Sequence, residues 1–314
     1  MTLLVQYTIA FACILSLVAL GGCFSEHSGV INLGLEGIMV MGALGGALMM
    51  KYLPPDTPAI LIVLLTVLAS VLAGMIYSVL LAVAAIHLKA DQTLVGTAMN
   101  MLGIALATVL VKAINMIESN GDNTSSIISY VNEKKAFIVN IKGFEFSWFM
   151  LITVILVIAS YIILYKTRFG LRLCACGEHP QAADSVGINV YKMRWAGVLI
   201  SGFLGGIGGI CYVTTGVSEW HFEYGVAGFG FLALAVMIFG RWKPQNIAMA
   251  ALLFGFFRTL SNVYAGFDFL KNLQIPGGIY NMLPYAISLV VLAFTSKSSR
   301  APKAEGIPYD KGSR

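Results

Sequence analysis

Charge is the property that this sequence has least of. Only 11% of its 314 residues are Asp, Glu, Lys or Arg, whereas 58% are hydrophobic, and the mean hydropathy is +0.83. Soluble globular domains carry about 25% charged residues, so the composition excludes that class. Apolar runs of the roughly 20 residues that a helix needs to cross a bilayer recur along the chain. The sequence therefore predicts an all-α polytopic membrane protein.

Motifs that bind nucleotide or perform catalysis are missing as well. Nowhere does the sequence read Gly-x-x-x-x-Gly-Lys-Ser/Thr. The chain therefore has no phosphate-binding loop, and energy from ATP would have to enter through another subunit. The glycine cluster GGIGG at 205–209 lies inside an apolar run rather than after a strand, which indicates close helix packing. No Ser-His-Asp or His-Glu-x-x-His arrangement is present. We expect no enzyme activity and no cofactor in this chain.

The cysteines are few and scattered, five in the whole sequence, which argues against a disulfide framework. Cys174, Cys176 and His179 lie close together on one connection, but no fourth ligand accompanies them, so a metal site is not expected. The net charge of +5 does not indicate nucleic acid, because its distribution follows membrane topology. The N-terminus lacks a positively charged region and a small-residue cleavage site, so we expect no cleavable signal peptide.

Apolar windows predict about nine membrane segments, within a range of roughly eight to ten. Two of them differ from a plain spanning helix, because 29–50 opens with glycines and 226–240 is short for a full crossing. Both are expected to be interrupted helices. The predicted segments cover residues 5–24, 29–50, 59–86, 92–115, 146–166, 195–215, 226–240, 246–264 and 281–296.

Lysine and arginine gather on one set of connections. They occur at 166–194, at 241–245 and in the tail, and cytoplasmic loops of membrane proteins carry the excess of these residues. The long connection 116–145 is acidic or balanced, so it is expected to be extracytoplasmic. The C-terminus is then cytoplasmic and the N-terminus extracytoplasmic. The chain is predicted to divide into a transmembrane domain at 1–296, which includes a cytoplasmic loop at 167–194, and a basic cytoplasmic tail at 297–314.

Two glycine-rich stretches resemble each other across the chain. SGVINLGL (28–35) and YGVAGFGF (224–231) share the pattern Gly-Val-x-x-apolar-Gly-apolar, and each follows a polar cluster. Paired interrupted spans in the two halves of a transporter are typical of an inverted repeat with the substrate path at the repeat interface. Chance similarity between glycine-rich apolar segments is the alternative.

A carboxylate stands inside the apolar stretch 29–50. A charged side chain at the bilayer centre costs roughly 2.5–3.5 kcal/mol, so Glu36 should face a wet cavity or a partner group. Asn32 lies on the same face if the segment is helical, and the glycines around them allow the backbone to unwind. One interpretation is a substrate path lined by Asn32 and Glu36. The other is that Glu36 caps a helix or pins a packing joint.

A second polar cluster opens the fourth predicted segment, in ADQTLVGTAMN (90–100). Gln92, Thr93 and Asn100 fall close to one helical stripe. Asn100 lies about two turns inside apolar sequence, so its amide needs a hydrogen-bond partner from a neighbouring helix or a solute. Lining of the substrate path and hydrogen bonding between helices both remain open.

The stretch HPQAADSVG (179–187) predicts a helix of about two turns outside the membrane. Pro180 stands where the first helical turn accepts proline, and Gly187 stands where a helix ends. A short capped helix on a cytoplasmic loop suits docking into the groove of a partner. The alternative is a linker that lies on the lipid surface, for which this stretch offers little apolar face.

Three longer stretches carry a resemblance to a known family. They are similar to permease subunits of the bacterial ABC importers for simple sugars and branched-chain amino acids, and the purine-nucleoside branch resembles them most. The resemblance covers nearly the whole chain except 116–145 and the tail. The stretches are SGVINLGLEGIMVMGALGG (28–46), CGEHPQAADSVGINVYKMRWAGVLISGFLGGIGG (176–209) and GFGFLALAVMIFGRWKP (228–244).

The resemblance implies a heteromeric importer in the bacterial plasma membrane. Its expected partners are ABC ATPase subunits, which would bind the ATP and Mg, a second permease subunit forming a heterodimer, and an extracytoplasmic substrate-binding lipoprotein. The expected substrate is a nucleoside or a similar small polar solute, with simple sugars of the ribose or galactose type and branched-chain amino acids as alternatives. The rival hypothesis is a proton-coupled secondary transporter in which Glu36 titrates. A third hypothesis is a membrane scaffold or sensor without transport.

The same resemblance assigns roles to residues. The loop around 177–187 resembles the family's coupling element, which sits in a cleft of the ATPase, although this chain has His179 where family members have Asn. Segment 29–46 resembles the interrupted span beside the translocation path. The expected coupling residues are Gly177, Glu178, Pro180, Ala182, Ala183 and Gly187, and the expected path residues are Asn32, Glu36, Gln92, Thr93 and Asn100.

Overall fold

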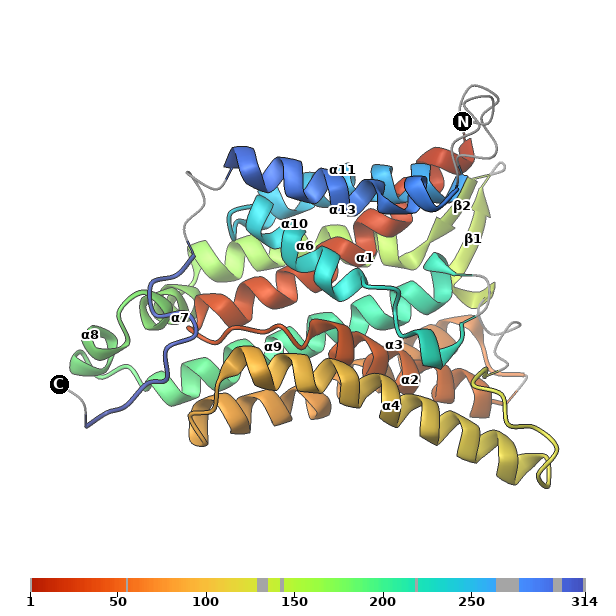
Figure 1. The fold of residues 1–314 in the computed structure, drawn as a ribbon, viewed down its shortest axis with the longest axis horizontal. Helices are drawn as coiled ribbons and strands as arrows, with labels where there is room; N and C mark the ends of the chain where they lie inside the picture. Colours follow the sequence, from red (N-terminus) through yellow and green to blue (C-terminus); the bar gives the residue numbers. More distant parts are fainter. Residues whose placement is uncertain are drawn as a thin grey trace.

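The computed structural model describes residues 2–54, 56–128, 135–141, 144–217, 220–263, 277–295 and 301–312. Within these ranges the protein is a bundle of helices that lie along its long axis (Figure 1). The predicted all-α polytopic class is confirmed, whereas the count of nine crossings is not. Seven described segments are long and apolar enough to span a membrane by length and composition: Leu3–His27, Ala59–His87, Gln92–Glu118, Trp148–Lys166, Val190–Gly216, Phe222–Phe239 and Pro244–Val263.

The long helices follow the predicted apolar segments, because an apolar run with helical propensity satisfies its backbone internally. Shorter elements connect them. The long helices are α1 (Thr2–His27), α2 (Leu35–Tyr52), α3 (Ala59–Ala82, continued by η1, Val83–His87), α4 (Gln92–Glu118), α6 (Trp148–Lys166), α9 (Val190–Cys211, continued by η3, Tyr212–Gly216), α10 (Phe229–Phe239), α11 (Pro244–Val263) and α13 (Gly277–Thr295). The shorter elements are η2 (Lys135–Phe137), the antiparallel hairpin β1 (Ile138–Ile141) and β2 (Phe144–Ser147), α7 (Arg168–Glu178), α8 (Pro180–Ser185) and η4 (Phe222–Tyr224).

Two predicted segments begin with backbone that is not regular α-helix. The expected interruption of 29–50 is present, because the regular helix α2 begins only at Leu35. The expected interruption of 226–240 is present as well, because α10 begins at Phe229. Gly29 and Gly228 have φ of 91° and 76°, a left-handed conformation that glycine adopts without steric cost. Gly29 lies two residues after the end of α1 and Gly228 is the N-cap of α10, so both belong to the non-helical backbone of the two interruptions.

Three helices cross at near backbone contact in the middle of the bundle. A Cβ added to Gly42 of α2 would lie 2.5 Å from Gly206 Cα of α9, and one added to Gly74 of α3 would lie 2.5 Å from Gly202 O. Small residues at such crossings allow the van der Waals packing that holds membrane helices together. The predicted packing role of the 205–209 glycine cluster is therefore confirmed.

The charges of the connections separate onto the two ends of the bundle. We call one the acidic end: there Lys51 Nζ lies 2.5 Å from Glu118 Oε2 and Gln6 Nε2 donates to Glu145 Oε2 over 2.8 Å. We call the other the basic end: it carries α7, α8 and the C-terminal segment 301–312, at the opposite side of Figure 1 from the N-terminus. Parts of the predicted loop 116–145, residues 129–134 and 142–143, lie outside the described residues.

Candidate functional site

Glu36 joins the two interrupted segments. It is the second residue of α2, and its carboxylate accepts hydrogen bonds from the backbone of α10: Gly228 N donates to Oε1 over 2.9 Å and Gly230 N donates to Oε2 over 2.7 Å. These are N–H groups that the first turn of a helix leaves without intrahelical partners. A carboxylate at a helix N-terminus is also stabilised by the helix dipole. The side chain is only 5% exposed, so it acts here as a buried cap.

From Glu36 the two helices lead in opposite directions. α2 runs to the acidic end, where Lys51 meets Glu118. α10 runs to Trp242, whose Nε1 donates to Glu26 Oε2 over 2.5 Å at the end of α1. The two helix breaks therefore face each other in opposite orientation, and the inverted repeat stays a prediction. The second sequence interpretation of Glu36, a capped packing joint, describes the observed geometry.

Asn32 and Asn100 satisfy the backbone of the first break. The Asn32 side chain is fully buried; its Nδ2 donates to Ser201 Oγ over 2.8 Å and its Oδ1 accepts from Gly34 N over 3.0 Å. Asn100 Oδ1 accepts from Gly37 N over 2.9 Å, and its Nδ2 donates to Leu33 O over 2.8 Å. Asn32 precedes α2, which begins at Leu35. It therefore does not share a helical face with Glu36, as was expected if the segment were helical.

Gln92 and Thr93 lie beside the same break, on its side toward the basic end of the bundle. Gln92 is buried, its Oε1 accepts from Ile31 N over 2.7 Å, and its Nε2 is buried without a hydrogen-bond partner in the described structure. Thr93 is exposed, because each residue turns a helix by about 100° and carries it off the face of its neighbour. Both border a cavity of about 260 Å³ together with Lys89 and Gly306. The three residues were expected to share one face of the helix. Only Gln92 and Asn100 lie on the buried face, and Thr93 does not.

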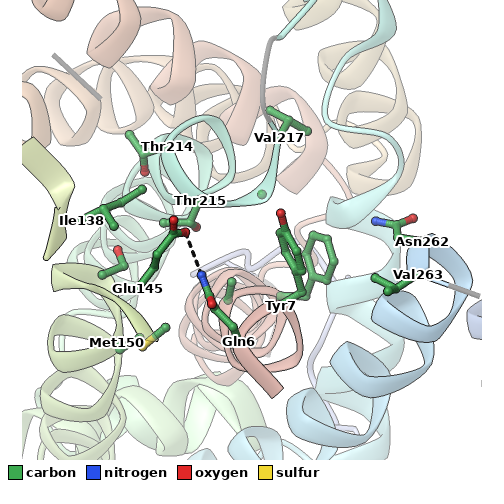
Figure 2. Close-up of a pocket in the computed structure, with 14 residues that line it drawn as sticks. Gln6, Tyr7, Ile138, Glu145, Met150, Thr214, Thr215, Val217, Asn262 and Val263 are labelled. Atoms are coloured by element: carbon green, nitrogen blue, oxygen red, sulfur yellow. Dashed lines mark hydrogen bonds between the residues drawn. The ribbon is translucent and has the colours of Figure 1, made fainter. Parts of the chain in front are cut away.

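A larger cavity of about 500 Å³ opens at the acidic end (Figure 2). Helices α1, α6 and α11, the hairpin and η3 contribute its walls. Aromatic rings and hydrogen-bonding groups share the lining, which is typical of a site for a small solute with one apolar face. The polar and aromatic lining residues are Gln6, Tyr7, Phe11, Glu145, Ser147, Thr214, Thr215 and Asn262.

The lining of this larger cavity was not predicted. Gln6 and the adjacent Thr214 and Thr215 are polar residues in apolar sequence, and polar side chains inside a membrane segment need a partner or a wet cavity. The sequence therefore contained a signal for these polar positions. Their proximity was not, because Gln6 and its partner Glu145 are 139 residues apart in the chain.

The short helix predicted at the basic end is present. α8 spans Pro180–Ser185 with proline in its first turn, and Gly187 follows with φ of 86°. The expected coupling residues divide into two groups. Glu178, Ala182 and Gly187 are exposed and available to a partner, whereas Gly177, Pro180 and Ala183 are buried and hold the helix in place.

Helix α7, which precedes α8, was not predicted. Thr167 caps it, with Oγ1 accepting from Gly170 N over 3.2 Å, and a threonine before a helical pattern is a sequence signal for such a start. The expected absence of a metal site is not contradicted, since no group of three His, Cys, Asp or Glu side chains able to hold an ion occurs among the described residues.

A bundle of long apolar helices with two opposed breaks and a short exposed helix at one end is typical of a membrane transport subunit. Residues 4–294 match the family described as the permease component of the branched-chain amino acid transport system. The chain belongs to this family. It is a multi-pass membrane protein and a transport component rather than an enzyme.

Individual relatives share most of their length with this chain. The guanosine ABC transporter permease protein NupQ of Bacillus subtilis is 39% identical over 318 residues, which cover 100% of this chain and 98% of the relative. The nucleoside ABC transporter permease protein NupC of Lactococcus lactis is 38% identical over 297 residues, covering 93% and 92%. A second Lactococcus lactis protein, the nucleoside ABC transporter permease protein NupB, is 22% identical over 305 residues, covering 96% and 82%.

Proposed function

We propose that this chain is a permease subunit of an ATP-driven importer for nucleosides in the bacterial plasma membrane. The observation that carries the proposal is the 39% identity to a guanosine permease along the whole chain. The cavity at the acidic end supports it, because Tyr7 and Phe11 offer rings to a base, while amide, carboxylate and hydroxyl groups such as Glu145 and Thr215 offer hydrogen bonds to a base and a ribose.

The proposed partners follow from the missing nucleotide site. Separate ABC ATPase subunits bind the ATP and Mg and supply the energy, and an extracytoplasmic substrate-binding protein delivers the solute. The partner permease is a different chain. Support for a heterodimer comes from the two Lactococcus lactis relatives, which carry the same nucleoside description but are 38% and 22% identical to this chain.

We place the basic end in the cytoplasm and the acidic end outside. The basis is the excess of lysine and arginine beside α7 and α8. The N-terminus then lies outside and the 301–312 segment inside. Solute enters through the cavity at the acidic end, and closure of the ATPases moves α8 as a rigid unit. The helix breaks at 28–34 and 225–228 are the places where the bundle can change between outward- and inward-facing states.

Filling the acidic-end cavity is expected to block transport. In Thr215→Trp the larger side chain occupies space that the solute needs, so uptake of guanosine by the reconstituted complex should fall by about tenfold or more, since a lost contact of about 1.4 kcal/mol changes occupancy tenfold. Protein yield and assembly should stay near wild type. Thr97→Trp, on the exposed face of α4, is the matched control. Unchanged uptake in the cavity variant would show that the solute does not pass this cavity.

A bulky charge on the exposed face of α8 is expected to separate the ATPase from the permease. Ala182 is exposed whereas Ala183 is 3% exposed, so Ala182→Arg alters the docking surface without disturbing the fold. Co-purification of the ATPase and ATP-driven uptake should both fall by about tenfold or more, as expected when a contact at the centre of an interface is lost. Ala59→Arg, exposed at the acidic end, should do neither. Normal ATPase binding by Ala182→Arg would remove α8 from the interface.

A further inference from the structure

The C-terminal segment 301–312 is packed against the basic end although it lies outside the family match, which ends at residue 294. In Figure 1 its trace runs past α7 toward α8. Ala304 N donates to Gly177 O over 2.8 Å, so the segment is attached directly to the end of α7. We call residues 301–312 the strap.

Arg194 of α9 connects the strap to the first helix break. Its side chain is fully buried, and Nη1 donates to Ile307 O over 2.9 Å. A Cβ added to Gly29 would lie 3.0 Å from Arg194 Nη2, so the guanidinium lies between the strap and the break. The strap also touches the break directly, since a Cβ added to Gly306 would lie 2.7 Å from Ile31 Cδ1.

Tyr309 connects the strap to the coupling helix. It is 4% exposed and forms a buried cluster with Cys176 of α7, Ala183 of α8 and Val190 of α9. Its ring meets that of Tyr191 edge-on, with centroids 5.3 Å apart. Truncating an aromatic side chain buried in this way removes far more packing than the loss of the exposed ion pairs near the end of the strap would.

We propose that the strap is a positioning element that carries the movement of α8 to the helix break at 28–34. The strap is hydrogen-bonded to the end of α7 and packs on α8 through Tyr309. It contacts the break directly at Gly306, and Arg194, which is bonded to the strap, lies beside Gly29 of the break. A segment that is fixed to both elements in this way can transmit movement from one to the other. The inference rests on the proposed function, in which α8 receives the ATPase movement.

A carboxyl group provides a test that needs neither transport nor ATPase. Burial raises the pKa of Glu305 from 4.5 to about 7, and its Oε2 is buried without a hydrogen-bond partner in the described structure. The titratable group beside it is Glu26 of α1, whose carboxylate accepts from the uncharged Trp242. Arg194 of α9 is already bonded to the strap backbone.

The sign of the pH effect follows from this raised pKa. The docked carboxyl holds its proton up to about pH 7, whereas a detached one loses it near 4.5, so docking weakens as pH rises between these values and changes no further above them. Trypsin cleavage after the exposed Lys303, which frees the rest of the strap, should therefore be faster at pH 7.5 than at pH about 5.5, relative to the same digest of Glu305→Gln. Equal pH dependence in both proteins would contradict the docked carboxyl.

Coupling itself is tested in proteoliposomes that contain the complete importer, by measuring ATP hydrolysed per guanosine taken up. Tyr309→Ala should raise this ratio about tenfold with ATPase binding unchanged, and Tyr309→Phe should restore it because the ring still packs. Ile307→Ala is the control, since this side chain is 57% exposed and only its backbone is bonded.

The outcomes are distinct. A parallel fall of hydrolysis and uptake in Tyr309→Ala, with an unchanged ratio, means that the strap only stabilises the fold and overturns the inference alone. A wild-type complex without ATP-driven uptake of guanosine overturns the proposed function, and the inference with it.

Discussion

Glu36→Ala is expected to destabilise the protein by roughly 2–6 kcal/mol, because each unsatisfied buried group costs about 1–3 kcal/mol. The substitution removes the acceptor of Gly228 N and Gly230 N together, at a side chain that is only 5% exposed. Whole domains are stable by only about 5–15 kcal/mol. We expect a sharply reduced yield in the membrane and a thermal midpoint, measured in detergent, that is lower by roughly 5–20 °C.

Glu118→Ala is the control for this experiment, since Glu118 is 45% exposed and pairs with Lys51 at the surface. Exposed pairs contribute about 0–1 kcal/mol, so its midpoint should barely move. A Glu36→Ala protein that is as stable as wild type but has lost uptake would contradict the capping role. It would favour the rival mechanism in which Glu36 carries a proton.

Gly206→Val is expected to prevent correct assembly of the bundle. A Cβ at this position would lie 2.5 Å from Ser70 O and 3.2 Å from Val71 Cα, and backbone atoms of a packed helix cannot move aside separately. Overpacking of a core costs about 1–3 kcal/mol and occasionally more, and the Ser70 Oγ to Gly206 O hydrogen bond of 2.7 Å would be lost as the helices part. Folded protein, measured by fluorescence size-exclusion chromatography, should fall at least about tenfold.

The matched control adds the two γ methyl groups of valine on the outer surface of the bundle. Ala105→Val lies on an exposed part of α4, where lipid accommodates the added volume, so its yield should equal that of wild type. A normal yield for Gly206→Val would mean that α3 and α9 do not cross at these glycines.

The sequence predicted those features that local pattern determines. Apolar length defined the spanning helices, Pro180 and Gly187 bounded α8, and the glycines before α2 and α10 marked the interruptions. Each of these depends on a residue and its near neighbours, so a single sequence contains the information.

Features that depend on long-range packing were not predictable in the same way. Glu36 could be recognised as a group that needs a partner, but its partners lie 192 and 194 residues away. The strap lies within the tail 297–314, which was predicted to be a basic cytoplasmic tail, and only the structure shows Tyr309 buried beside Ala183. Thr93 follows the buried Gln92 directly, and the helical pattern of the sequence alone did not show that Thr93 lies off the buried face.

ATP-dependent uptake of guanosine is the measurement that decides whether this chain is a permease of an ABC importer for nucleosides. The chain is reconstituted with its partner permease, the ATPase subunits and the binding protein, and labelled guanosine inside the proteoliposomes is counted with ATP or with an imposed pH gradient. We expect uptake with ATP alone, and we expect it to be lost when the ATPase is omitted. Uptake by this chain under a pH gradient, without ATPase subunits or ATP, would contradict this expectation.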